Sequence, residues 1–312
     1  MANLARFAEA IGNEEKPAAW ALRGMDDARA TNQREVLAIL SLDAIPHLLL
    51  DDYYAEVLDL AMDTGALLAA GEQQLQAGQV PQGFELDVAA LLGNKSGELR
   101  RKAEHNAVLV GLLPIIFRIC TVALHNPELA QTQATEVAAI CRQINATAVD
   151  QQLWITAAEL LEQIHSQEVS HTEIIRRSNQ FDPQSDTVLQ AIGYLVATLQ
   201  DNIPIEEALR VHMKLARFVY ENLRRLSAVY RRVILPFFID YWKSKFERMP
   251  LLFRSTQFVS RIFNTVKNLP EAEQLQFTLM AVAFSINVKM LPEFVRWVMA
   301  SAPGVFSFFS SL

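Results

Sequence analysis

Glycine and cysteine are scarce in this chain of 312 residues, and both shortages exclude classes of function. Eleven glycines leave little material for the turns that cradle phosphate groups, and no glycine-rich phosphate loop, nucleophile elbow or His-Glu-x-x-His motif occurs. The two cysteines, Cys120 and Cys141, cannot build a disulfide scaffold or a zinc site of Cys-x-x-Cys pairs. Their apolar neighbours, such as Ile119 and Ile140, indicate inert buried thiols.

Runs of alternating β-branched residues are also absent, whereas apolar residues recur at helical spacing along most of the chain. A composition that is 51% hydrophobic and 20% charged supplies enough apolar surface for a sizeable core. We therefore predict an all-α protein, either a multi-helix bundle or a short irregular helical solenoid, with no significant β-sheet. The expected helices include residues 46–64, 66–77, 97–125, 127–144, 148–178 and 204–248, the last of them broken at Pro236.

Two local signals divide the chain. Phe181-Asp182-Pro183-Gln184-Ser185-Asp186 combines a pre-proline restriction with Asx and Ser capping chemistry, so we expect a boundary there. It would separate an acidic helical region at 1–181 from a helical region at 182–312 with a basic stripe and an apolar tail, unless the two form one domain. Asn126-Pro127-Glu128 predicts a helix start, with Asn as the N-cap.

The mean hydropathy of +0.13 leaves room for a surface that faces a membrane or a partner. Residues 107–124 are apolar and 18 residues long, but Pro114 and Arg118 interrupt them, which favours a kinked core helix over a membrane span. The first residues lack the order of a signal peptide. We expect a cytoplasmic protein, with a peripheral position at the inner face of a membrane as the alternative.

Charge is distributed very unevenly along the chain. Residues 1–94 hold 5 basic and 15 acidic side chains, and residues 35–94 contain no Lys or Arg at all. Residues 208–267 hold 13 basic and 3 acidic side chains. The net charge of −7 therefore hides an acidic region and a basic region, which indicates separate contact surfaces.

The basic region also has a geometric pattern. On a helical wheel of residues 209–235, apolar side chains such as Met213 and Ala216 occupy a broad arc, and cations occupy the narrow remainder. An aromatic-basic run follows Pro236. The candidate partner-binding residues are Arg210, Lys214, Arg217, Arg224, Arg225, Arg231, Arg232, Tyr241, Trp242, Lys243 and Lys245.

Four interpretations fit this pattern. The cations can neutralise the acidic region at residues 35–87 within one fold, or they can meet an acidic surface of another subunit or another copy. Next to aromatics and the apolar C-terminus they also suit an anionic membrane, and, less well at this acidic pI, nucleic acid. We predict a non-enzymatic interaction or scaffold protein, or a subunit of a larger assembly, that contacts an acidic protein surface through residues 210–254. Docking on anionic lipid is the alternative.

A metal-dependent enzyme is a further alternative. Two Glu-x-x-His matches, Glu162/His165 and Glu168/His171, lie in the helix expected at 148–178. In carboxylate-bridged bundles such motifs converge from separate helices, whereas these two would point away from each other on one helix. We expect no cofactor, and we expect His171 at the edge of the core, hydrogen-bonded to a neighbouring helix.

Overall fold

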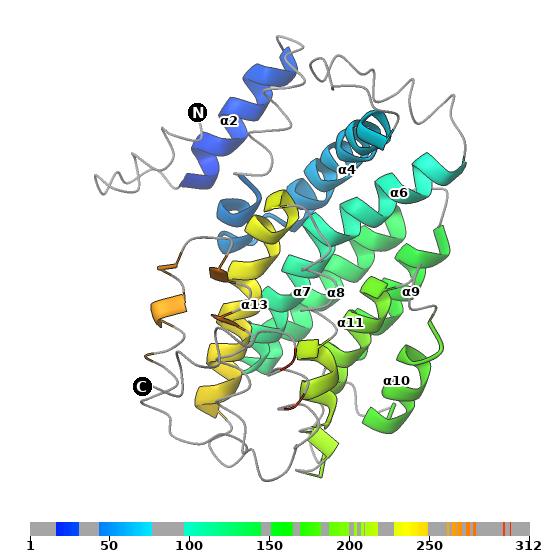
Figure 1. Ribbon diagram of the computed structural model, residues 1–312, viewed down its shortest axis with the longest axis vertical. Helices are drawn as coiled ribbons and strands as arrows, with labels where there is room; N and C mark the ends of the chain where they lie inside the picture. The colour runs from blue at the N-terminus through cyan, green and yellow to red at the C-terminus, as the bar shows by residue number, and fades with distance from the viewer. Residues whose placement is uncertain are drawn as a thin grey trace. The chain divides into compact units, whose positions relative to one another are not determined.

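A computed structural model of the chain describes residues 17–30, 44–76, 97–144, 151–164, 169–181, 187–199, 210–217 and 228–248, with short pieces between 203 and 300 (Figure 1). Every regular element among these residues is a helix and none is a strand, which confirms the all-α prediction. The labelled elements are α2 (Pro17–Ala30), α4 (Tyr54–Gln76), α6 (Gly97–Ala107), η1 (Val108–Leu112), α7 (Leu113–Ala123), α8 (Pro127–Gln143), α9 (Gln151–Glu162), α10 (His171–Ser178), α11 (Thr187–Ala197) and α13 (Ala228–Arg248).

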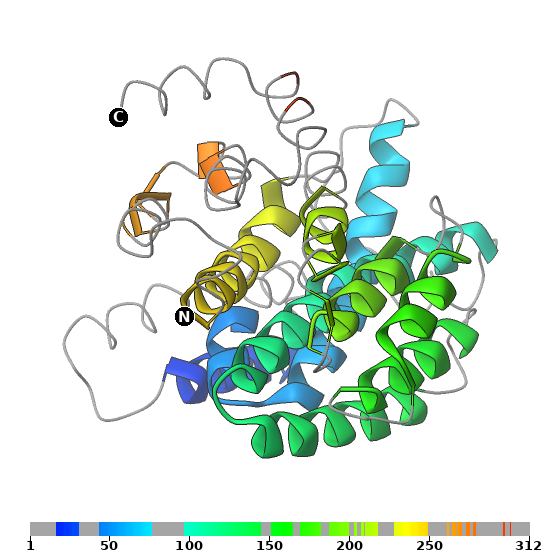
Figure 2. The same ribbon diagram turned by 90° about the horizontal axis from the view of Figure 1, so that it is seen from below.

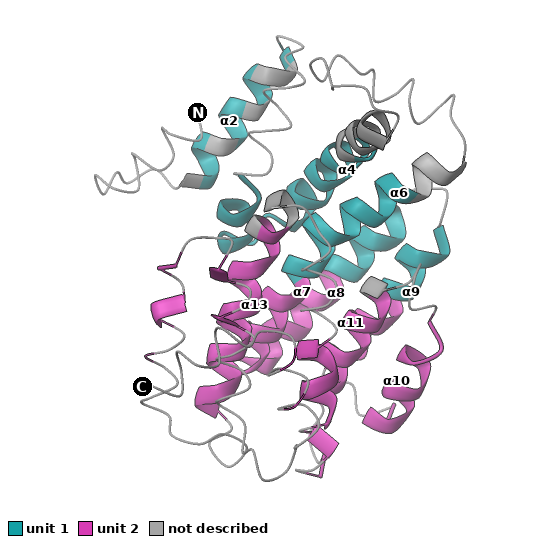
Figure 3. Ribbon diagram, in the orientation of Figure 1, with its two compact units in different colours: residues 1–115, 137–158 teal, residues 116–136, 159–312 magenta. Residues whose placement is uncertain are grey.

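The chain forms two compact units (Figure 3). Unit 1 comprises residues 1–115 and 137–158, and unit 2 comprises residues 116–136 and 159–312. The predicted boundary at Phe181–Asp186 lies inside unit 2, where the helices on either side of it, α10 and α11, pack against each other. A Cβ atom built on Gly193 of α11 would collide with the side chain of Ser178, so this helix contact requires a glycine.

A tight turn in unit 1 separates a helix at residues 44–50 from α4. The amide of Tyr53 donates to the carbonyl oxygen of Leu48 (3.0 Å), and the amide of Asp52 donates to that of Leu49 (3.4 Å). These two bonds form a Schellman helix end, which needs a left-handed residue, and Asp52 adopts φ 62°. The hydroxyl of Tyr54 donates to Asp52 Oδ1 (2.8 Å), so the acidic side chain is fixed as well.

The core of unit 1 depends on a close approach between α4 and the α6–η1 segment. A Cβ atom on Gly65 would lie 2.5 Å from the carbonyl oxygen of Ala103 and 2.8 Å from the amide nitrogen of Ala107. A Cβ atom on Gly111 would lie 2.5 Å from that of Ala61. The sequence predicted a helix end at Gly65, and this was wrong: α4 runs through it, because the glycine makes room for a neighbouring backbone.

The predicted proline kink takes the form of a π-helical segment, η1, between α6 and α7. The amide of Leu113 donates to the carbonyl oxygen of Val108, five residues earlier. Proline at position 114 lacks an amide hydrogen, and its ring would clash with the carbonyl of a regular preceding turn. A wider turn just before Pro114 relieves that clash without ending the helical run.

The run from Lys102 to Ala123 is long and apolar enough to cross a membrane by length and composition. However, 83% of its most apolar window is buried inside the protein. Core helices of soluble proteins meet the same criterion, so the compartment stays a prediction.

Two helices stand where the sequence predicted one at 148–178. α9 ends at Glu162, and α10 begins after Ser170. The hydroxyl of Ser170 accepts a hydrogen bond from the amide of Glu173 (3.3 Å), which is one half of a capping box. The cap predicted at Asn126 is confirmed, since Asn126 Oδ1 accepts from the amide of Leu129 (3.1 Å) at the start of α8.

α13 passes Pro236 without the predicted break (Figures 1 and 2). Pro236 is exposed, whereas the residues before and after it are buried. Because proline has no N–H, the carbonyl four residues before it loses its hydrogen-bond donor. When the proline is on the outer side of a helix, water can hydrate that carbonyl, so the helix continues.

Replacing Gly65 by alanine should destabilise the protein. Alanine gains about 0.5–1 kcal/mol of helix stability, but overpacking costs about 1–3 kcal/mol, and no rotamer change can move a neighbouring backbone away. We expect a net loss of about 1–2 kcal/mol in urea unfolding. Ala55→Gly, at an exposed position of α4, calibrates the propensity effect alone. A stability gain for Gly65→Ala would contradict this packing.

Candidate functional site

One helical segment of unit 2, residues 210–217, presents cations on one side and apolar groups on the other. Arg210, Lys214 and Arg217 are exposed, at spacings of four and three residues. Their neighbours Val211, His212, Met213, Leu215 and Ala216 are all buried. Over these residues the structure therefore shows the two-faced helix that the wheel predicts. We call Arg210, Lys214 and Arg217 the basic face.

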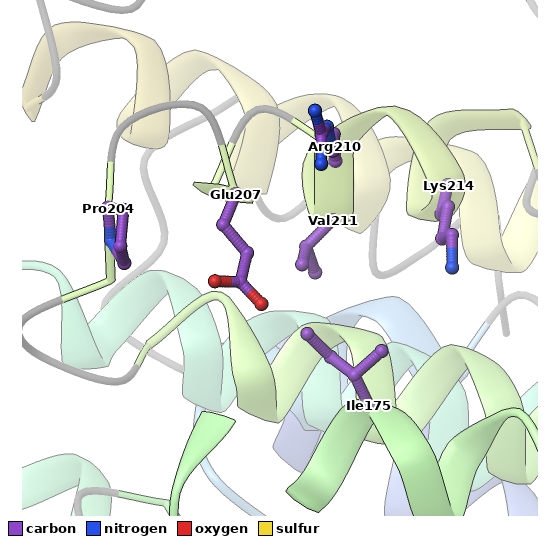
Figure 4. A pocket seen from close by; sticks show the side chains of 6 residues that line it. All are labelled: Ile175, Pro204, Glu207, Arg210, Val211 and Lys214. Atoms are coloured by element: carbon purple, nitrogen blue, oxygen red, sulfur yellow. The ribbon is translucent and has the colours of Figure 1, made fainter. Parts of the chain in front are cut away.

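A cavity of about 390 Å³ opens beside this face. Figure 4 shows Glu207, Val211 and Lys214 extending from the helical segment toward the side on which Ile175 of α10 lies. The volume of this cavity is in the range typical of ligand pockets. The residues that line it are Ile175, Pro204, Glu207, Arg210, Val211 and Lys214.

A contact between a histidine and a carboxylate connects α10 to this wall of the cavity. Nε2 of His171 lies 3.1 Å from Glu207 Oε2, and both side chains are partly exposed. The carboxylate of Glu207 is therefore engaged, whereas neither Arg210 nor Lys214 forms an ion pair with any residue that the structure describes. Two cations remain available to a partner at the edge of a cavity whose apolar lining consists of Ile175, Pro204 and Val211.

The cations of α10 differ from those of the basic face, because both are paired with one carboxylate of the same helix. Arg176 and Arg177 both donate to Glu173, at 2.7 Å and 2.8 Å. These hydrogen bonds lower the pKa of the Glu173 carboxyl group to about 2, with a smaller contribution from the nearby positive charges. Glu173 thus stays charged and holds both arginines.

The structure describes two of the four metal candidates, Glu162 and His171. His171 pairs with Glu207, Glu162 is exposed on α9, and His165 and Glu168 lie outside the described residues. Among the residues that the structure describes, no group of three or more His, Cys, Asp or Glu side chains is arranged to hold a metal ion.

The predicted aromatic-basic run lies largely inside unit 2. Tyr241 and Trp242 are 0% exposed, Lys245 is 2% exposed and Lys243 is half-buried, so the first three are not on the surface where the sequence placed them. The physical reason is packing: Phe117 contacts both Phe238 (ring centroids 5.5 Å) and Tyr241 (5.8 Å).

Other predicted partner-binding residues contribute less. Arg231 is only partly exposed, and no side-chain placement is described for Arg232. Arg224 and Arg225 lie outside the described residues. The basic face at residues 210–217 is therefore the part of the predicted stripe on which a site can be built.

A polar cluster lies beneath the basic face. Nζ of Lys245 donates to the backbone carbonyl oxygen of Thr198 (2.6 Å), and the hydroxyls of Thr198 and Tyr241 share a 2.6 Å hydrogen bond. Burial raises the pKa of Tyr241, and the nearby Cys120 adds to this effect. Burial also raises the pKa of the Cys120 thiol to about 12, although Lys245 opposes the shift. Both cysteines of the chain are free and buried, which confirms that prediction.

His212 is the unusual member of this cluster. Its ring is 1% exposed and packs on Trp242 with centroids 5.5 Å apart, and neither ring nitrogen has a hydrogen-bond partner among the described residues. Burial, assisted by the charge of Lys245, holds the pKa of His212 well below its usual value. The imidazole is therefore neutral at pH 7 and acts as an aromatic packing group.

Sequence reasoning missed His212, although a signal was present. On the helical wheel it falls inside the apolar arc, one turn before Ala216. Lys245 was misplaced for the opposite reason: it was counted by its charge, and the pattern does not reveal the backbone carbonyl that it reaches.

The stability of the protein should fall as the pH is lowered from 7 to 5. The unfolded chain binds a proton on His212 near pH 6.5, whereas the folded protein does not until the pH reaches the depressed pKa. Between these values the free energy of unfolding should decrease by up to about 1.4 kcal/mol per pH unit from this group. Urea unfolding followed by tryptophan fluorescence measures it.

Two variants isolate the contribution of His212. His212→Leu should flatten the pH dependence between pH 7 and 5, because the titrating group is removed. Lys245→Met should leave the pKa of folded His212 less depressed, because one of its two causes disappears. Stability should then be lost over a narrower pH range. If the free energy of unfolding depends on pH in the same way in His212→Leu and in the unmodified protein, the buried imidazole is not the cause of the pH dependence.

Comparison with known proteins does not indicate the role of this site. No protein-family description, no characterised protein and no solved structure matches the chain significantly. What the site can do chemically therefore follows from its own residues: two available cations, an apolar cavity wall and a carboxylate that is already paired.

Proposed function

We propose that the chain is a non-enzymatic interaction protein, or a subunit of a larger assembly, that binds an acidic protein surface at the basic face of unit 2. One observation carries the proposal: Arg210 and Lys214 border a cavity, and neither forms an ion pair with a described residue. Cations with no internal partner beside an apolar recess suit a partner that brings carboxylates and apolar side chains together.

The lining of the cavity favours protein over a polyanion. Ile175, Val211 and Pro204 supply apolar contacts that a phosphate backbone does not use. Glu207 adds a negative charge within the lining, which repels a run of closely spaced phosphates more than it repels one or two carboxylates.

The burial of the aromatics weakens the alternative of membrane docking. Interfacial binding relies on exposed Trp and Tyr side chains at the headgroup level, and nucleic-acid stacking needs exposed aromatic rings. Tyr241 and Trp242 are fully buried. The apolar C-terminus, which also motivated the membrane interpretation, lies outside the described residues.

The proposed compartment is the cytoplasm. Both cysteines are free thiols, as expected for a reducing environment. An enzymatic role gains no support from Glu162 and His171, since the first is exposed on α9 and the second pairs with Glu207.

Reversing the two cavity cations should abolish partner binding while the fold stays intact. We expect the double variant Arg210→Glu/Lys214→Glu to lose at least about tenfold in affinity, because attraction becomes repulsion at exposed positions that no internal ion pair uses. The measurement is a pull-down at about 0.1 M and about 1 M salt, with the eluate assayed for protein, nucleic acid and lipid.

The matched control is Arg248→Glu/Arg261→Glu, which makes the same charge change at two exposed cations that do not line the cavity. It should retain binding, and far-ultraviolet circular dichroism should show both variants folded. Anionic vesicles and duplex DNA are the defined competing probes. Binding of either probe that is lost only in the Arg210/Lys214 variant would replace the protein partner with lipid or nucleic acid, and unchanged capture would exclude this face as a binding surface.

A further inference from the structure

A second surface of the molecule is opposite in charge to the basic face and exposes apolar side chains. Among the described residues, three large hydrophobic side chains are exposed, and two of them, Leu50 (57%) and Tyr53 (36%), lie in the turn before α4. Exposed Asp52 lies between them, and Glu56 and exposed Asp59 follow on α4. We call these five residues the acidic patch.

Two carboxylates of the acidic patch, Glu56 and Asp59, have no basic residue near them in the sequence. No Lys or Arg occurs anywhere from residue 35 to residue 94. Glu56 and Asp59 form no ion pair with any residue that the structure describes. Their spacing of three residues places both carboxylates on one side of α4, next to the exposed apolar pair.

The turn that carries Leu50 and Tyr53 is held in one conformation. The Schellman bonds to Leu48 and Leu49 and the Tyr54–Asp52 hydrogen bond fix its backbone and its acidic side chain. A protruding apolar group on a fixed turn loses little conformational entropy when it is buried against a partner. The exposed apolar side chains of this turn are therefore suited to binding in a preformed cavity.

We infer that the acidic patch of one copy of this chain docks into the cavity beside the basic face of a second copy. Leu50 would contact the apolar wall formed by Ile175 and Val211, while Glu56 and Asp59 would lie near Arg210 and Lys214. This inference rests on the proposed function and names the acidic protein surface.

Charge complementarity is what selects this occupant. An apolar side chain flanked by carboxylates would match the apolar and cationic residues that line the cavity. The chain itself exposes such a side chain, Leu50, at the turn before α4. Both surfaces have charged groups without internal partners, so pairing them between copies satisfies both at once.

The two surfaces are different, so the contact is heterologous. Each copy offers one acidic patch and one basic cavity, and repeated docking produces either a closed ring, of which a reciprocal two-fold dimer is the smallest, or an open chain. A variant that lacks either surface can therefore occupy only the end of an assembly.

The test is sedimentation velocity on the full chain over a range of concentrations. The weight-average mass should rise above 35.1 kDa with concentration at about 0.1 M salt and return toward it at about 1 M salt. Arg210→Glu/Lys214→Glu and Glu56→Lys/Asp59→Lys should each weaken association at least tenfold. An equimolar mixture of these two variants should form a one-to-one complex, because one intact pair of surfaces remains.

Charge exchange makes the test specific. The chain that carries all four substitutions should associate again, since the attraction is restored with the signs exchanged. Glu128→Lys/Glu136→Lys on α8 is the matched acidic control and should behave like the unmodified protein, as should Leu129→Ala, whereas Leu50→Ala should weaken association.

A mass of 35.1 kDa at every concentration and salt overturns the inference, and so does a Glu56/Asp59 variant that associates normally. The proposed function is judged separately. If the pull-down still captures a protein that depends on Arg210 and Lys214, that function stands with a different partner. If capture is insensitive to those cations as well, both fail.

Discussion

The contact between the rings of His212 and Trp242 determines which side chains of residues 210–217 reach the surface. His212 and Trp242 are both buried, and their rings lie 5.5 Å apart. Once this side of the helical segment faces α13, helical geometry turns Arg210, Lys214 and Arg217 outward. The basic face and the position of Lys214 in the cavity are therefore consequences of an interior contact rather than of the charges themselves.

That contact constrains the charges that unit 2 can hold inside. Lys245 obtains a strong hydrogen bond from its ammonium group to the Thr198 carbonyl oxygen, whereas His212 obtains none. A second buried cation beside Lys245 would be uncompensated, so the imidazole remains neutral. Because His212 shares its helical segment with Lys214, a disturbance of the interior contact moves one wall of the cavity.

Much of the fold could be predicted from periodicity and capping. Helical spacing predicted the all-α class, and Asn126 marked the start of α8. The errors occurred at residues whose meaning depends on a neighbour distant in the sequence. Gly65 was interpreted as a helix end, because sequence alone does not show that the backbone of α6 passes beside it. Ser170 was overlooked, although the Glu three residues later completes a readable capping pattern.

The site was predictable in its charge but not in its extent. The wheel anticipated Arg210, Lys214 and Arg217, since their environment follows from helical phase. It failed for Tyr241, Trp242 and Lys245, because every side of α13 carries aromatic or basic residues and phase alone does not choose the buried side.

This difference changes the kind of recognition that the chemistry supports. A surface that exposed all 13 cations of residues 208–267 would act through its summed field and would attract any polyanion. Once Lys245 is buried and Arg176 and Arg177 are held by Glu173, the charges available beside the cavity are few and have fixed positions. A few fixed charges next to an apolar recess discriminate by geometry, since only a partner with carboxylates at the matching distance from an apolar side chain satisfies both. Selectivity at this surface thus depends on the cations that folding buries or pairs as much as on those that it leaves exposed.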